Sequence, residues 1–173
     1  ADYAIARSIT IKAPPAVIFA HVNNLKKWQA WSPWAGRDPN SKNSYAGPPA
    51  GVGARFDWDG NDEVGAGYMK ITESSPPKQI AMDLNFTRPF EDQSQVTFDF
   101  DRAADGTQVT WQLTGTNNFV ERTIMTAMLI DLEAEVGKEY EAGLRSLKEV
   151  AEKEVAAAAA ADQQQSPDAD AAP

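Results

Sequence analysis

Apolar and polar residues alternate along six segments of the chain, the pattern of strands with one buried face. In residues 3–12, Ile5, Ile9 and Ile11 share one face, and small or polar residues occupy the other. Five further segments follow at residues 54–60, 67–74, 78–86, 94–102 and 107–115. Short runs rich in Gly, Pro and Asp separate these five segments, so the pattern predicts hairpins and an antiparallel sheet.

Three segments have helical periodicity instead. Pro14 and Pro15 suit the first turn of a short helix that ends near Asn24, and residues 25–31 predict a second short helix. From Phe119 to about Ala161 an apolar residue recurs every three or four positions, which predicts one long helix. Its predicted stripe contains Leu129, Leu132, Val136, Tyr140, Leu144, Leu147 and Val150. Residues 35–53 predict a long loop, and loops of that length are usually functional or mobile.

These elements predict an α+β fold of about six or seven strands, whose sheet wraps around the C-terminal helix. The strand residues predicted to face inward are almost entirely apolar and aromatic, whereas the aspartates of the strands are predicted to face outward. Acid–base catalysis requires a titratable group inside a pocket, and the strand phase provides none there. We expect one domain over residues 1–155, followed by a low-complexity tail over 156–173 that is disordered after a frayed helical start.

Composition excludes several kinds of site. The net charge of −9 argues against nucleic-acid binding and against anionic membranes. Since the chain has no cysteine and a single histidine, we expect no metal site. Two Gly-x-Gly segments lead into strands rather than a helix, so we expect no dinucleotide and no other cofactor.

Location and oligomeric state leave no clear trace in the sequence. No apolar run reaches the roughly 20 residues of a membrane span. The chain begins at Ala1, so either an initiator Met was trimmed or a longer leader is missing. We expect a cytoplasmic protein, or a membrane-anchored or exported one if such a leader precedes Ala1.

Three polar residues and one glycine are candidate functional positions. His21 shares the apolar face of the first short helix, where a hydrogen-bonded core residue is the favoured reading and a general base the alternative. Tyr140 is equally consistent with a core residue and with a ligand-facing hydroxyl. Arg7 is expected at a sheet edge with its head in solvent rather than on an acidic ligand. Gly143, on the helical stripe, favours close packing against the sheet over space for a ligand.

Several segments together resemble one superfamily: residues 7–24, "WQAWSPW" at 28–34, "DPN" at 38–40, and residues 45–76, 106–115 and 140–148. In this order they resemble the START/SRPBCC superfamily, in its bacterial polyketide cyclase/dehydrase-like branch. The resemblance implies the helix-grip fold of the birch pollen allergen, with two short helices capping an apolar cavity between the sheet and the long helix. Trp28, Trp31 and Trp34 are then expected where the cap meets the sheet, at least one of them lining the cavity and another purely structural.

We expect the cavity to bind or carry a small hydrophobic molecule, such as a lipid, an isoprenoid or a polyketide-like compound. The expected ligand-binding residues are Trp28, Trp31, Phe56, Trp58, Met69, Met82, Phe86, Phe98, Phe100, Trp111, Met128, Leu132, Val136 and Tyr140. One alternative is a cyclase or dehydrase that uses His21, Tyr140 or a carboxylate of the 35–53 loop. A second alternative is an interaction module in which the loop and the tail dock a partner.

Overall fold

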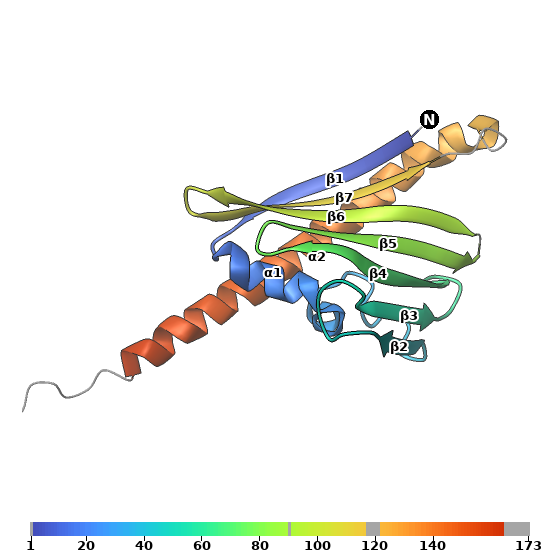
Figure 1. The fold of residues 1–173 in the computed structure, drawn as a ribbon. Coiled ribbons are helices and arrows are strands. Elements are labelled where there is room, and N and C mark those ends of the chain that lie inside the picture. Colours follow the sequence, from blue (N-terminus) through green and yellow to red (C-terminus); the bar gives the residue numbers. More distant parts are fainter. Residues whose placement is uncertain (1, 90, 117–121, 165–173) are drawn as a thin grey trace, which may run out of the picture.

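A computed structural model of the protein describes residues 2–89, 91–116 and 122–164. Seven strands form one antiparallel sheet in the order β1-β7-β6-β5-β4-β3-β2 (Figure 1). Their bounds are β1 Asp2–Ile11, β2 Lys42–Ala46, β3 Arg55–Asp59, β4 Ala66–Ser75, β5 Gln79–Arg88, β6 Asp92–Ala103 and β7 Gly106–Thr116. The helices are α1 Pro15–Asn23, the 3-10 helix η1 Leu25–Ala30 and α2 Arg122–Gln164.

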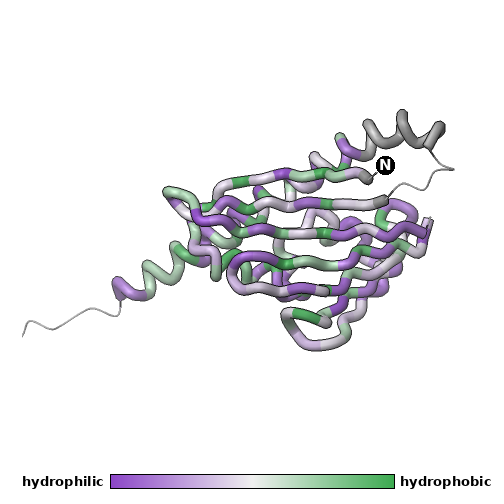
Figure 2. Tube along the Cα trace, turned by 45° about the horizontal axis from the view of Figure 1, so that its top comes forward, coloured by the Kyte–Doolittle hydropathy of each residue, from purple (hydrophilic) through white to green (hydrophobic). Residues whose placement is uncertain are grey.

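The alternation of the sequence appears directly in the sheet. Along the strands, hydrophobic and hydrophilic residues succeed one another (Figure 2). Cross-strand pairing joins Ile80 to Phe98 and Phe98 to Trp111, so apolar residues from three strands form one row on the inner face. All three side chains of this row are buried, and such cross-strand pairs stabilise a sheet through their side-chain contacts.

β2 lies inside the segment 35–53 that the sequence predicts as a loop. Every residue of β2 is exposed, so burial imposes no alternation of apolar and polar residues on it. The strand pairs with β3 alone and forms one edge of the sheet, while β1 forms the other edge.

α2 lies across the inner face of the sheet and packs chiefly against β1 (Figure 1). Tyr140, Leu144 and Leu147 of the predicted stripe are buried there, and Val136 and Val150 are half-buried. A side chain at Gly143 would meet Cζ3 of Trp111 at 2.8 Å and Cδ of Pro33 at 2.9 Å. This glycine therefore allows the close approach of helix and sheet that the sequence favours.

Beyond Val155 the helix continues to Gln164 with every residue exposed, and it extends away from the sheet in Figure 1. Residues 165–173 of the predicted tail lie outside the described residues, and the domain limit at residue 155 stays a prediction. No helix in the described part of the chain combines the length and the apolar composition of a membrane span.

Candidate ligand-binding pocket

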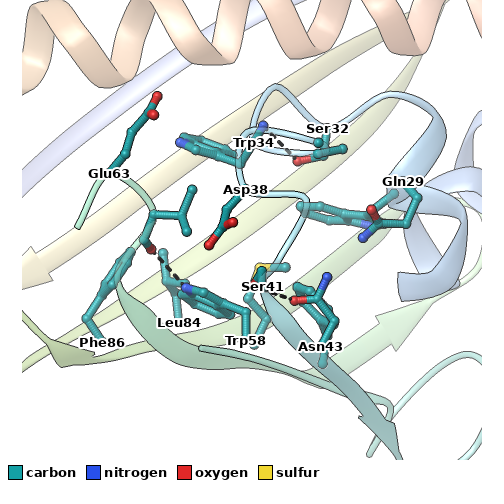
Figure 3. A pocket seen from close by; sticks show the side chains of 16 residues that line it. Gln29, Ser32, Trp34, Asp38, Ser41, Asn43, Trp58, Glu63, Leu84 and Phe86 are labelled. Carbon is teal, nitrogen blue, oxygen red and sulfur yellow. Dashed lines mark hydrogen bonds between the residues drawn. The ribbon is translucent and has the colours of Figure 1, made fainter. Parts of the chain in front are cut away.

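A pocket of about 240 Å³ lies between the inner faces of β3, β4 and β5 and the segment that follows η1 (Figure 3). Its apolar lining consists of Trp28, Trp34, Ala35, Phe56, Trp58, Val64, Met69, Leu84 and Phe86. Its polar lining consists of Gln29, Ser32, Asp38, Ser41, Asn43 and Glu63, with the backbone of Gly36 beside them. Five aromatic rings thus surround a space edged by polar groups.

The pocket exists because the helices cover only part of the inner face. Inward-facing residues near α1, η1 and α2, such as Ile71, Ile80 and Phe98, are fully buried. Phe56 and Leu84 have the same inward phase, yet they are only half-buried. The segment after η1 arches over these residues without filling the space beneath it (Figure 3).

Gly67 shapes the floor of the pocket. A side chain at this position would collide with the Asn85 carbonyl oxygen of β5 and would meet Cζ2 and Cη2 of Trp58, each at 3.0 Å. Glycine therefore lets β4 pair closely with β5 while the indole lies against it. The Trp58 indole nitrogen donates a hydrogen bond to the Val64 carbonyl at 2.9 Å. Its ring meets the Phe86 ring edge to face, with centroids 5.4 Å apart. Together these contacts hold the Trp58 ring in one orientation.

Asp38 brings a carboxylate to the pocket and also pins the overlying segment. Its Oδ1 accepts a hydrogen bond from the backbone N–H of Asn40 at 2.9 Å, and its Oδ2 accepts one from the backbone N–H of Asn61 at 2.7 Å. The second bond joins the segment after η1 to the turn between β3 and β4. A carboxylate has about four acceptor positions, so these two bonds leave capacity for a ligand.

Arg37 ties the same segment to the long helix. Its Nε donates to the Pro33 carbonyl at 3.0 Å, its Nη2 pairs with Glu139 of α2, and its Nη1 lies 3.8 Å from Glu63. The hydrogen bond to Glu139 raises the pKa of the Arg37 guanidinium above its ordinary value. The cover of the pocket is therefore fastened at Asp38 and at Arg37.

Five of the residues expected from the sequence line the pocket: Trp28, Phe56, Trp58, Met69 and Phe86. Six others are buried in the core instead: Trp31, Met82, Phe98, Phe100, Trp111 and Tyr140. Val136 is half-buried against that core, and the side chains of Met128 and Leu132 lie outside the described residues.

Packed aromatic rings fill the space beneath α2 where the cavity was expected. Trp31 meets Trp111 edge to face with ring centroids 5.6 Å apart, and Trp111 stacks on Tyr140 with centroids 3.9 Å apart. The pocket therefore lies to the side of α2. Trp28 and Trp34 line it, while Trp31 is enclosed in the core and donates from its indole nitrogen to the His21 carbonyl at 3.2 Å.

Sequence reasoning missed Leu84, Asp38 and Glu63 as lining residues. Leu84 shares the inward phase of β5, which is a signal that could have identified it. Asp38 is the single carboxylate of the segment 35–53, and the sequence proposed it there only as a possible acid or base. Glu63 lies in a turn, and no pattern in the sequence marks it.

The other polar positions do not reach the pocket. The His21 ring is buried and its Nε2 pairs with Glu154 of α2. Burial raises the pKa of Tyr140 well above its ordinary range. Arg7 lies at the β1 edge, half-buried, with its Nε 3.0 Å from a Glu141 carboxylate oxygen, and it fills the space beside Gly137. These placements remove His21 and Tyr140 as pocket acids or bases.

Over the residues that the structure describes, no three His, Asp or Glu side chains gather in a way that could hold a metal ion.

Similar folds occur among solved structures. Protein MLL2253 from Mesorhizobium loti shares 16% identity and a TM-score of 0.63, with 87% of this chain and 98% of that chain covered. Ara h 8.0201 shares 10% identity and a TM-score of 0.60, covering 87% and 98%. The di-domain ARO/CYC StfQ from the steffimycin biosynthetic pathway shares 12% identity and a TM-score of 0.67, covering 90% and 52%. At these identities the similarity shows the fold alone.

No curated protein matches the chain. The family model described as "Polyketide cyclase / dehydrase and lipid transport" matches residues 3–152, almost the whole described fold. The chain therefore belongs to the polyketide cyclase/dehydrase and lipid transport family, with a helix-grip fold.

Proposed function

We propose that this protein binds a small, largely apolar molecule in the pocket beneath the segment after η1. The observation that carries the proposal is the half-buried state of the apolar pocket residues Phe56, Trp58, Met69, Leu84 and Phe86, whereas Ile71, Ile80 and Phe98 on the same inner face are fully buried. A ligand that covered these side chains would gain the free energy of removing apolar surface from water. Family membership supports the same role, since the family description includes lipid transport.

The size of the pocket narrows the ligand class. Its volume of about 240 Å³ lies below the range of roughly 300–1,000 Å³ that is typical of ligand pockets. A compact ring system or a short chain suits this space better than a long lipid tail. The surrounding aromatic rings favour a flat ligand, because offset and edge-to-face contacts are available on several sides.

Binding can be tested with naphthalene-sized neutral probes, with 1-naphthalenemethanol as the first choice, followed by tryptophan fluorescence and by calorimetry. Ala35→Trp places an indole at the pocket wall and should abolish binding. Ala50→Trp makes the same change at an exposed loop position outside the lining and should leave binding intact. The proposal would be contradicted if Ala35→Trp and Ala50→Trp bound the probe with equal affinity. It would also be contradicted if the unmodified protein did not bind the probe.

A second candidate function is cyclisation or dehydration of a ligand in the same pocket. The observation that favours it is the Asp38 carboxylate, which faces the pocket while two backbone amides hold it in place (Figure 3). Such a base would take a proton from the carbon between two carbonyls, and that carbon would then bond to a third carbonyl carbon as its C=O double bond opens to an alkoxide. The alkoxide would take the proton back from the Asp38 carboxyl, and loss of water would give the aromatic ring. The structural similarity to the ARO/CYC protein StfQ is consistent with this chemistry.

The enzymatic candidate is tested with a short synthetic polyketone, by following the absorbance of an aromatic product. Asp38→Asn should lower the rate by roughly 10²-fold or more, the usual contribution of a positioned general base, and should preserve binding of the neutral probe. Glu63→Gln serves as the comparison at the second lining carboxylate. An unchanged rate in Asp38→Asn would exclude Asp38 as the base.

A further inference from the structure

The charges at the pocket indicate which kind of apolar ligand it accepts. Of the described side chains that line the pocket, the charged ones are Asp38 and Glu63, and both are acidic. The protein as a whole carries a net charge of −9, which adds to the negative potential at the site. An anionic head group would therefore enter against both the local and the overall field.

The two carboxylates have different neighbours. Glu63 is exposed and lies 3.8 Å from the Arg37 guanidinium, which reduces its effect on a ligand. Asp38 is half-buried, and among the described side chains no Lys, Arg or His nitrogen lies within ion-pair distance of it. Its two backbone hydrogen bonds orient the carboxylate without adding a full positive charge. The charge of Asp38 is thus available to a cation in the pocket.

Aromatic rings surround this carboxylate. In Figure 3 the Asp38 carboxylate points into the pocket between the side chains of Trp34 and Trp58. The face of an indole ring carries partial negative charge and attracts an ammonium group, with tryptophan the strongest of the aromatic residues in this respect. A cation at this position would contact both a carboxylate and indole rings, whereas an anion would face repulsion from each.

We propose that the pocket prefers compact apolar ligands that carry a protonated amine, with the ammonium group at Asp38 and the apolar body against Phe56, Trp58 and Phe86. This inference rests on the proposed function and adds the charge of the ligand to it. It disfavours fatty acids and other carboxylates as natural ligands, although the family description includes lipid transport.

Three probes with one ring system test the preference: 1-naphthylmethylamine, 1-naphthalenemethanol and 1-naphthoic acid, which are cationic, neutral and anionic at pH 7. We expect the amine to bind about tenfold more tightly than the alcohol, and the acid to bind more weakly than the alcohol. Asp38→Asn should lower the affinity for the amine to the affinity for the alcohol. The affinity for the alcohol itself should not change. Asp105→Asn, at the exposed turn between β6 and β7, alters the net charge equally and should preserve the preference.

The outcomes separate the two proposals. If the alcohol binds but the amine binds no more tightly, or if Asp38→Asn keeps the full preference for the amine, the charge preference is wrong and the apolar pocket stands. If no probe binds, both proposals fail. A loss of alcohol binding in Asp38→Asn, together with a lower melting temperature, would show that Asp38 acts through the pocket cover and would overturn its role as the ammonium partner.

Discussion

At the scale of single residues, the two glycines inside α2 have different neighbours. Gly143 faces the Trp111 ring and Pro33, both held in place by the packed core. Gly137 faces the guanidinium of Arg7, the far end of a long side chain. A glycine within a helix costs roughly 1 kcal/mol relative to alanine, so both positions need a structural reason or are open to improvement.

Gly143→Ala should therefore lower the free energy of unfolding by about 1–3 kcal/mol, the usual cost of overpacking a core. Gly137→Ala should be neutral or stabilising by up to about 1 kcal/mol, because the Arg7 head can move aside and alanine favours the helix. Urea denaturation of both variants measures the difference. Equal destabilisation would show that Gly137 is as tightly enclosed as Gly143.

Tyr140 should make the protein sensitive to alkaline pH. Because burial raises the pKa of Tyr140 in the folded state, its phenol ionises near pH 10 only in the unfolded chain. Stability is then complete below pH 10 and falls as the pH rises further, by about 1.4 kcal/mol per pH unit for one such group.

Denaturation at pH 8 and at pH 10.5 should show a smaller loss of stability for Tyr140→Phe than for the unmodified protein. Part of the loss should persist in the variant, because burial also raises the pKa of Tyr3. Identical losses in the two proteins would contradict this role for Tyr140.

At the scale of elements, α2 has a packed part and an exposed part. Leu144, Leu147 and Ala151 are buried, whereas every described residue from Ala156 onward is exposed. The exposed part repeats alanine, a strong helix former, so the helix continues there without tertiary contacts. The packed part is the one that stabilises the domain.

Truncation after Val155 should change the free energy of unfolding by no more than about 0.5 kcal/mol, as for other changes at exposed sites. Truncation after Ala142 removes two buried leucines, each contributing roughly 1.5–3 kcal/mol, and should unfold a domain of ordinary stability. Thermal melts followed by circular dichroism distinguish the two. A cooperative melt of the chain truncated after Ala142, or the loss of a cooperative melt in the chain truncated after Val155, would place the domain boundary elsewhere.

At the scale of the whole molecule, Arg37 connects three parts that are distant in sequence: the segment after η1, the β3–β4 turn and α2. Its contacts keep the pocket cover beside the helix. The stability of the long helix and the closure of the pocket are therefore physically linked through one half-buried guanidinium.

Arg37→Gln should lower the free energy of unfolding by about 1 kcal/mol, the usual net contribution of one intramolecular hydrogen bond. If the ordered pocket cover contributes the same free energy, about 1 kcal/mol, to ligand binding, the affinity for 1-naphthalenemethanol should fall about fivefold. Arg102→Gln, at an exposed position near the end of β6, serves as the control. Unchanged binding in Arg37→Gln would show that the pocket does not depend on this connection.

The strands could be predicted because half-buried strands alternate, and β6 shows this plainly. β2 could not, because it has no buried face. Phe56 and Trp58 line the pocket and can be predicted from their inward phase, but Phe98 and Trp111 share that phase and are enclosed in the core. Strand phase identifies the inner face of a sheet and says nothing about which part of it another element covers.

The sequence by itself determined the antiparallel sheet, its apolar inner face, the long C-terminal helix and the family, because periodicity and local motifs are properties of neighbouring residues. Only the tertiary structure decided that Trp31, Trp111 and Tyr140 fill the space beneath α2, and that the pocket lies beside it. It also decided that Asp38 faces the pocket and that His21 pairs with Glu154. The physical reason is that these arrangements depend on contacts between segments far apart in the chain, which form only when the elements pack together.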